Sequence, residues 1–195
     1  MVLTSVVPVP AWLIPPKGGF EAADLDRLPD LPPHTELIDG SLVLVSPQAH
    51  LHSLTLDVLL AALHRTVPSD LRVRRQMTVT LSRRQRPEPD LVIVRAQATQ
   101  DLAATTFAPD DVTLIVEVVS PDSRERDRKR KPQLYAEAGI EHFWLVENER
   151  SKPILQTYML DPVATVYRHT GIYKGIVNFD IPYPIEIDFG EIDRL

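Results

Sequence analysis

Acidic residues that interrupt apolar stretches are the main candidates for chemistry in this 195-residue sequence. Asp90 precedes the apolar run Leu91–Val94, and Glu117 lies inside the run 114–119 with a valine on each side. A carboxylate among such neighbours needs a cation or hydrogen bonds to stay charged. Two carboxylates at neighbouring strand ends would form a site for a hard divalent cation such as magnesium. The alternative is that Glu117 pairs with a nearby arginine or lies at a sheet edge.

A basic residue that could join these acids lies in the segment Asp127-Arg-Lys-Arg-Lys131. Asp127 and Lys131 are four residues apart, so they share one face if the segment is helical. Pro132 disfavours helical geometry at the residue before it, so we expect the helix proper to begin at Lys131. Lys131 would then lie near the end of the strand that carries Glu117. The alternative is that the segment is the solvated, basic start of a helix.

The charge of the chain is unevenly distributed. There are 21 basic and 27 acidic residues, a net charge of −6, which by itself argues against a nucleic-acid partner. Residues 72–86, however, contain six arginines and no acid, and residues 122–131 contain six basic and three acidic residues. A basic strip on an acidic body can attract phosphates while nonspecific binding stays weak. Arg72, Arg74 and Arg75 are therefore candidate nucleic-acid contacts, unless these arginines only solvate a strand.

Several classes of protein are excluded by composition and missing motifs. The chain has no cysteine, which excludes disulfides, thiolate zinc sites, iron–sulfur clusters and a cysteine nucleophile. Its apolar stretches fall far short of the ~20 residues that a membrane-spanning helix needs. The glycine-rich phosphate loops, the G-x-S-x-G elbow and H-E-x-x-H are missing as well. We expect a cytoplasmic protein without a membrane partner.

Hydrophobic periodicity and turn residues predict a mixed α/β (α+β) fold. Asp39-Gly40 is a turn pair that favours a tight hairpin, and continuous β-branched runs favour strands buried on both faces. The expected elements are a hairpin over 35–45, a helix over 50–67, a half-exposed strand over 71–81, buried strands over 90–94, 112–119 and 142–146, a helix over 122–138 closed by Gly139, and further short strands over 153–195.

A set of short motifs gives the chain its resemblance to a known family. In order and spacing they resemble the Uma-two family of restriction-endonuclease-like proteins, a branch of the PD-(D/E)XK nuclease superfamily. The resemblance covers about residues 20–147. The matching pieces are Glu36-Leu-Ile-Asp-Gly40, Ser46-Pro47 with His52, Glu88-Pro-Asp90, Glu117-Val-Val-Ser-Pro121, Asp127-x-x-x-Lys131, Tyr135, Gly139 and Phe143-Trp144-Leu145-Val146.

The resemblance implies a restriction-endonuclease-like mixed β-sheet flanked by helices, and a metal site. Asp90 and Glu117 match the two acids that hold magnesium in the superfamily, and the backbone carbonyl of Val118 would be a further ligand. The superfamily lysine stands two residues after the glutamate, where this chain has Val119. The resemblance suggests that the lysine has migrated to the following helix, as Lys131.

Further positions follow from the same resemblance. Glu36 and His52 match family positions and are expected to take part in catalysis, with His50 as a rival for His52. Gln76 is a weaker candidate from the neighbouring strand. We expect a Pro-rich arm over 1–20 and one domain over 21–195, with a core over 35–147 and a C-terminal β extension over 153–195.

The preferred function is a divalent-metal-dependent endonuclease, using magnesium or manganese and acting on DNA, with RNA left open. A homodimer or higher homo-oligomer is expected, because cutting two strands suits two-fold symmetry. Two alternatives remain open at this point. One is a non-catalytic interaction module that has kept the nuclease fold, and the other is a hydrolase of another phosphate ester.

Overall fold

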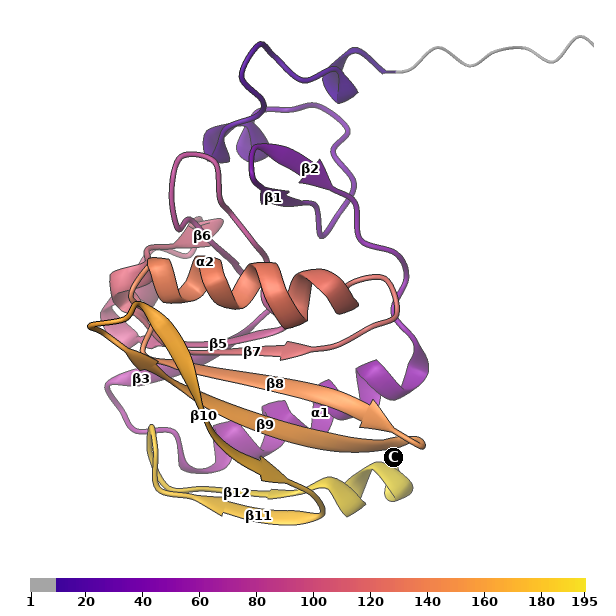
Figure 1. Cartoon of the computed structure of the whole chain (residues 1–195), viewed down its shortest axis with the longest axis vertical. Coiled ribbons are helices and arrows are strands. Elements are labelled where there is room, and N and C mark those ends of the chain that lie inside the picture. The colour runs from indigo at the N-terminus through magenta and orange to yellow at the C-terminus, as the bar shows by residue number, and fades with distance from the viewer. Residues whose placement is uncertain (1–9) are drawn as a thin grey trace, which may run out of the picture.

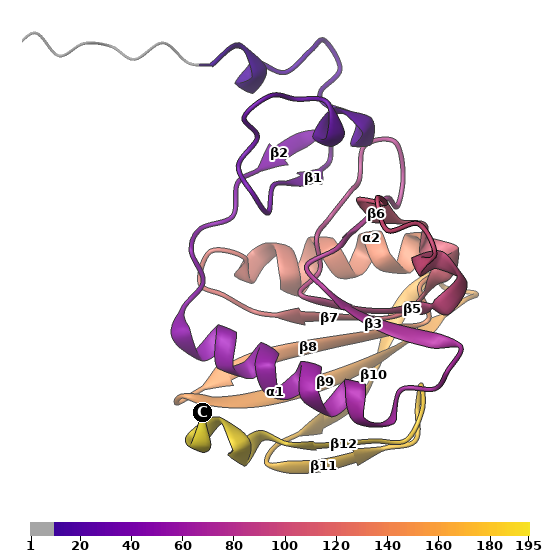
Figure 2. The ribbon, with the colours of Figure 1, turned by 180° about the vertical axis from the view of Figure 1, so that it is seen from behind.

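A computed structural model describes residues 10–195, which form a six-stranded mixed β-sheet with one helix on each face. The helix α1 (His50–Thr66) lies along one face and α2 (Lys131–Glu137) along the other (Figures 1 and 2). This is the mixed α+β architecture that the sequence predicts. The first nine residues of the expected arm lie outside the described part of the chain. In sheet order the strands are β10 (Val166–Tyr173), β9 (Lys152–Asp161), β8 (His142–Glu149), β7 (Val112–Val118), β5 (Leu91–Arg95) and β3 (Leu71–Arg75).

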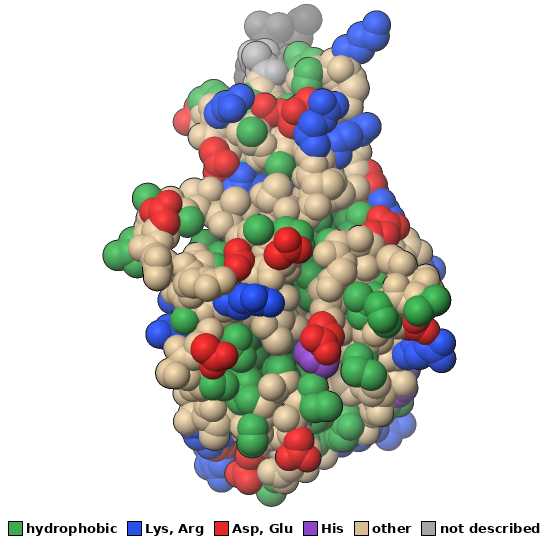
Figure 3. Space-filling view, turned by 90° about the vertical axis from the view of Figure 1, so that its left-hand side faces the viewer, with side chains coloured by type: hydrophobic (Ala, Val, Ile, Leu, Met, Phe, Trp, Pro, Cys, Tyr) green, Lys and Arg blue, Asp and Glu red, His purple; other side chains and the backbone are tan. Residues whose placement is uncertain are grey.

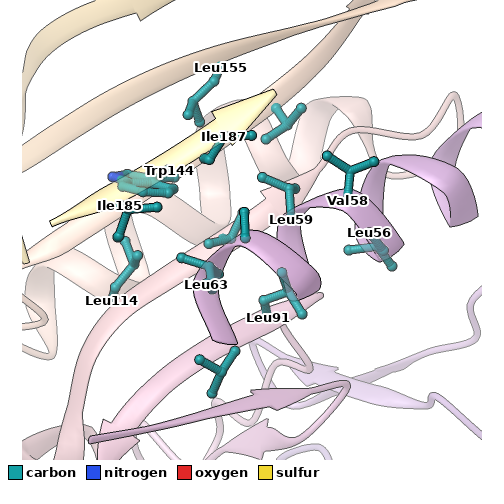
Figure 4. Close-up of a cluster of buried hydrophobic side chains, with 14 of the residues drawn as sticks. Leu56, Val58, Leu59, Leu63, Leu91, Leu114, Trp144, Leu155, Ile185 and Ile187 are labelled. Atoms are coloured by element: carbon teal, nitrogen blue, oxygen red, sulfur yellow. The ribbon is translucent and has the colours of Figure 1, made fainter. Parts of the chain in front are cut away.

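The face covered by α1 holds the larger hydrophobic core. The apolar side of α1 packs on inward-facing residues of the central strands, and three residues of the hairpin β11 (Ile176–Phe179) and β12 (Ile185–Asp188) complete the cluster. Figure 4 shows this packing from the side of the helix. The residues labelled there are Leu56, Val58, Leu59, Leu63, Leu91, Leu114, Trp144, Leu155, Ile185 and Ile187.

The opposite face is covered by the connection between β7 and β8. These two strands are parallel, so the chain crosses over the sheet between them, and α2 is the crossover helix. A π-helical turn, Arg126–Arg130, leads directly into α2 at Lys131. The backbone is therefore helical without a break from residue 124, and Lys131 itself is helical, with φ −60° and ψ −46°, so the expectation that Pro132 makes the helix begin at Lys131 is wrong. Gly139 ends the crossover with a φ of 80°, as expected of a glycine after a helix.

The N-terminal hairpin lies on the α2 side of the sheet (Figures 1 and 2). Its strands are β1 (Glu36–Ile38) and β2 (Ser41–Val43), joined by Asp39-Gly40. Both turn residues have positive φ, 53° and 75°, which is the backbone of the predicted tight turn. A backbone bridge from Leu37 to Arg86 ties the hairpin to the rest of the domain. The hairpin thereby brings Glu36 over the sheet.

Two expected elements differ from the structure. The strand expected over 71–81 is broken at Gln76, whose φ of 52° leaves the extended region, and the pair β4 (Thr78–Val79) with β6 (Thr106–Phe107) forms a separate small sheet. The C-terminal strands are longer than expected, because β9 and β10 pair along most of their length at the edge of the main sheet. The prolines of this region lie at strand ends and loops.

In the described part of the chain, none of the helices combines the length and the apolar character needed to span a membrane.

The end of the molecule at which β7 and β8 begin is seen in Figure 3. Acidic, basic and apolar side chains are interspersed there, without a continuous basic field. The candidate residues for chemistry lie toward the other end of these strands.

Candidate active site

The strand register sets two acidic residues side by side. The antiparallel pairing of β5 with β7 sets Leu91 opposite Val116. Asp90, the residue before β5, therefore lies opposite Glu117, the residue after Val116. Ile115, two residues before Glu117, packs in the hydrophobic cluster on the α2 face. Because side chains alternate along a strand, Glu117 lies on that face too. The structure therefore brings together the two carboxylates that the sequence singles out.

Lys131 lies among three carboxyl groups in the interior. Its Nζ is 2.7 Å from Glu36 Oε1, 3.1 Å from Glu117 Oε1 and 3.4 Å from Asp127 Oδ1. These four side chains are each at most 5 % exposed. Three acids thus share one ammonium group, which leaves the cluster with more acidic than basic groups.

Tyr135 holds the glutamate from the same helix. Its hydroxyl donates a hydrogen bond to Glu117 Oε1 over 2.5 Å, and its ring is fully buried. Asp127, Lys131 and Tyr135 follow one another at intervals of four residues, so they form one stripe of the helical segment. The whole stripe is turned toward Glu117.

Asp90 is held by a histidine and by the backbone. His52 Nε2 is 3.1 Å from Asp90 Oδ1, and the amide of Val118 donates to Asp90 Oδ2 over 2.7 Å. Val118 therefore contacts Asp90 through its N–H group, whereas the expected role of this residue is that of its carbonyl group as a metal ligand. Of the two histidines at the start of α1, His52 touches the acid, whereas His50 is exposed.

A cavity of about 360 Å³ opens beside Asp90. Its walls include Glu88, Gln76 and His34, and Gln76 also donates its backbone N–H to the carbonyl oxygen of Asp90. The Glu88 backbone N–H donates to Glu36 Oε1 over 2.8 Å, and Glu88 Oε1 is 2.5 Å from His34 Nδ1. The cavity thus gives a ligand access to one side of the acidic cluster.

The electrostatics of the cluster follow from burial. Burial raises the pKa of Glu117 well above its usual value, and it also raises the pKa of Asp127 and of Glu88. Burial alone would lower the pKa of Lys131, but the surrounding carboxylates outweigh it and raise that pKa well above the usual value. Lys131 therefore keeps its proton, while the acids lack a full set of counter-charges.

These residues fit a divalent cation. Among residues 10–195, no three Asp, Glu or His side chains are arranged as a complete metal site. Magnesium, however, commonly uses one or two protein carboxylates and takes its other ligands from water and substrate phosphate. Asp90 and Glu117 are two carboxylates in register, one of them opening onto a cavity, in a cluster with an excess of acid.

The three candidate nucleic-acid residues lie on the edge strand β3. Arg72 and Arg74 pair with Val94 and Val92, which pack on the α2 face, so both arginines lie on the side of Lys131. Their guanidinium groups donate to nearby main-chain carbonyl oxygens. Arg75 lies on the other face, where its Nη1 is 3.8 Å from Asp57 Oδ1. Arg75 is the last residue of β3, and the residue after it, Gln76, lines the cavity.

Three residues of the site received no role from the sequence. Tyr135 could have been found from its spacing, since it lies four residues after Lys131. Glu88 lies two residues before Asp90, which was a weaker signal. His34 has no pattern around it, and its place at the cavity depends on a positive φ of 60°.

Comparisons with known proteins support the fold and give a family. The sequence pattern of the Uma2 family, described as "Putative restriction endonuclease", matches residues 22–172. A crystal structure described as "a putative nuclease belonging to DUF820 from Anabaena variabilis ATCC 29413" is similar, with a TM-score of 0.62 and 15 % sequence identity. The match covers 89 % of this chain and 97 % of that chain, and it shows a shared fold. No curated protein matches the chain.

Proposed function

The chain belongs to the Uma2 family, and we propose that it is a divalent-metal-dependent endonuclease that hydrolyses phosphodiester bonds of DNA. The family description and the nuclease-like fold support a nuclease. The observation that carries the finer proposal is the meeting of Asp90, Glu117 and Lys131 next to an open cavity.

In this proposal Asp90 and Glu117, with the carbonyl of Val118, would hold Mg²⁺ or Mn²⁺. When bound, the cation supplies polarisation of the scissile phosphate and lowers the pKa of the attacking water. The ammonium of Lys131 stabilises the negative charge that develops on the phosphate, because it stays protonated and is held in place before the reaction.

The remaining residues of the site position these groups. Glu36 and Asp127 fix the Lys131 ammonium from two sides, and Tyr135 fixes the Glu117 carboxylate. His52 orients Asp90 through its contact with Oδ1. Each of these contacts removes freedom from a group before substrate arrives, which is how an active site reduces the cost of reaching the transition state.

DNA is the proposed substrate because arginines of the edge strand β3, Arg72 and Arg74, lie on the strand that leads to the site. Guanidinium groups bind backbone phosphates and position a duplex or a strand without reading its sequence. Arg72 and Arg74 lie on the face that carries Lys131, so phosphates bound there would lead toward the cavity. A two-fold homodimer is the assembly we propose for cutting both strands.

The test is cleavage of supercoiled plasmid and of single-stranded DNA by the purified chain, first with Mn²⁺ and then with Mg²⁺. Asp90→Asn and Glu117→Gln are expected to abolish cleavage and the metal-dependent heat in calorimetric titrations with Mn²⁺. Glu186→Gln, an exposed acid on β12, is the matched control and should cut like wild type.

Two outcomes favour the alternatives. Wild-type protein that gives no heat with Mn²⁺ and cuts no DNA would be a non-catalytic module. Hydrolysis of nucleotide phosphate esters without cleavage of DNA, together with a shallow salt dependence of binding, would indicate another phosphate-ester hydrolase. Cleavage by Asp90→Asn at the wild-type rate would contradict the assigned site.

A further inference from the structure

A second cavity, of about 270 Å³, adjoins the proposed active site. It lies where the carboxyl ends of the parallel strands β7 and β8 meet the start of α1, and we refer to it as the strand-end cavity. Ligands of α/β proteins commonly bind outside the carboxyl ends of strands. Its wall includes Ala49, His52, Val119, Pro121, Arg124 and Asn148.

His52 joins this cavity to the active site. Its side chain is 6 % exposed and lines the strand-end cavity, while its Nε2 contacts Asp90. Its second ring nitrogen, Nδ1, has no hydrogen-bond partner among residues 10–195. A buried polar atom without a partner is uncommon in folded proteins, so Nδ1 has a hydrogen-bonding capacity that the described residues do not use.

The walls of the cavity suit a flat, largely apolar ligand. Leu51, Val119, Pro121 and Pro153 supply aliphatic surface, and Asn148 supplies an exposed amide near the rim. An asparagine amide carries both donors and an acceptor, as does the edge of a nucleobase. The volume equals about nine water molecules at roughly 30 Å³ each, which accommodates one base but not a base pair.

The rim of the cavity suits a phosphate. Arg128 and Lys129 form ion pairs with Glu147 and Glu125, whereas Arg124 has no ion-pair partner within the described residues. The 17-residue helix α1 begins at the same rim, and its N-cap residue, Ala49, cannot cap the first turn with a side chain. The free N–H groups of a helix start and an unpaired guanidinium both attract anions.

We propose that the strand-end cavity binds one nucleotide of single-stranded DNA, with its unpaired base inside the cavity and its phosphate at Arg124. This inference rests on the proposed nuclease function and names its substrate class, because the cavity shares His52 with the site at Asp90. A nucleotide held there is adjacent to the phosphate that is cut. A base that is paired within a duplex cannot enter, so the cavity takes a nucleotide only from an unpaired stretch of a strand.

The experiment compares the binding of a fluorescently labelled single-stranded oligonucleotide with that of the matching duplex. Binding is followed by anisotropy in EDTA, so that no cleavage occurs. Ala49→Trp places an indole at the cavity rim from an exposed position. It should weaken single-strand binding about tenfold, because the stacking of one base is lost, and leave duplex binding within about twofold. The matched control Ala61→Trp, exposed on α1 outside the cavity, should change neither.

Two results would overturn the inference. One is single-strand binding by Ala49→Trp equal to that of Ala61→Trp, and the other is an equal loss on single strand and duplex. If Ala49→Trp does not melt like wild type, Asn148→Ala replaces it, with Asn178→Ala as its exposed control. Asn148→Ala should then weaken single-strand binding alone, and an affinity equal to that of Asn178→Ala overturns the inference.

The outcome is independent of cleavage. A protein that shows the expected binding pattern but cuts no DNA would retain the cavity assignment and lose the proposed nuclease function. A protein that cuts DNA in a metal-dependent way, but binds both oligonucleotides equally in every variant, would retain the function and lose the cavity assignment.

Discussion

The central feature at the scale of single residues is one lysine that serves three acids. A buried charge is tolerated only when it is paired with an opposite charge, and the ammonium group of Lys131 is paired with three carboxyl groups. Those carboxyl groups, of Glu36, Glu117 and Asp127, share this single cation, so they are not fully neutralised. Removal of Lys131 would leave three carboxyl groups without a counter-charge, whereas removal of one acid leaves the lysine paired.

This imbalance predicts how stability depends on pH. Burial raises the pKa of Glu117, Asp127 and Glu88 in the folded protein. A carboxyl group with a raised folded pKa contributes stability that is fully present below its unfolded pKa, near 4. That stability is lost as pH rises through the folded pKa. In EDTA these three groups should therefore lower the free energy of unfolding as the pH rises above their unfolded pKa. Burial lowers the pKa of His142, which acts in the opposite direction up to the unfolded pKa of that histidine, and urea denaturation measures the sum.

A single substitution tests whether Glu117 causes this dependence of stability on pH. Glu117→Gln should reduce the slope of the free energy of unfolding against pH. It should also raise the melting temperature at pH 8 in EDTA by roughly 2–4 °C, equivalent to about 1 kcal/mol in a chain of this length. Glu186→Gln should leave the slope unchanged. The raised pKa of Lys131 acts only in alkaline solution, since its contribution is present below its unfolded pKa. An equal dependence of stability on pH in wild type and in Glu117→Gln would contradict this account.

At the scale of elements, the sequence indicated most pieces of the fold. The β-branched runs 90–94 and 112–119 predicted buried strands, because that signal is local. The helix start expected from Pro132 was wrong, since the backbone is helical from residue 124 onward. The break at Gln76 was missed, since a positive φ in a residue other than glycine leaves no local mark. The lengths of β9 and β10 were underestimated, because their pairing with one another and with β8 depends on the whole sheet.

The candidate site was predictable in its residues but not in its contacts. Asp90 and Glu117 stand out because acids are rare in apolar runs, and the i,i+4 spacing joins Asp127 to Lys131. That Asp90 faces Glu117 depends on the register of β5 with β7, which local sequence does not determine. The contact of Glu36 with Lys131 depends on how the N-terminal hairpin packs over the sheet, a long-range arrangement as well.

The faces of β7 predict a rescue experiment. Val119 packs against the same cluster as Ile115, so a side chain at position 119 points to the α2 face, as Glu117 does. Lys131→Ala should lower the cleavage rate by about 10²–10³, the range found when one preorganised charge-stabilising group is removed. Adding Val119→Lys should restore part of the rate, because a new ammonium enters the same cluster.

The matched control for the rescue is Val166→Lys in the Lys131→Ala background, because Val166 is an exposed valine on the edge strand β10. It should restore nothing. A thermal melt of each double variant shows whether it is folded. Cleavage by Lys131→Ala at the wild-type rate would contradict the role of the lysine, and a folded Val119→Lys double variant without any gain would contradict the shared face.

At the scale of the whole molecule, the distribution of charge matters more than its sum. The chain carries a net charge of −6, yet Arg72, Arg74 and Arg75 lie together on the edge strand β3, which leads to the proposed site. The opposite end of the molecule presents mixed charges (Figure 3). An acidic body repels DNA in general, so productive binding should depend on a few local phosphate contacts.

Arg72 and Arg74 lie on the face of Lys131, and Arg75 lies on the face of α1 near Asp57. The double variant Arg72→Ala/Arg74→Ala should therefore weaken DNA binding more than Arg75→Ala. Each phosphate contact that is lost should reduce the slope of log K against log salt concentration by about 0.9 for a duplex and about 0.7 for a single strand. Arg168→Ala, at an exposed arginine on β10, is the control and should leave both affinity and slope unchanged. Anisotropy titrations at several salt concentrations measure both quantities in EDTA. A double variant with the wild-type slope would mean that these arginines solvate the strand and that the phosphates bind elsewhere.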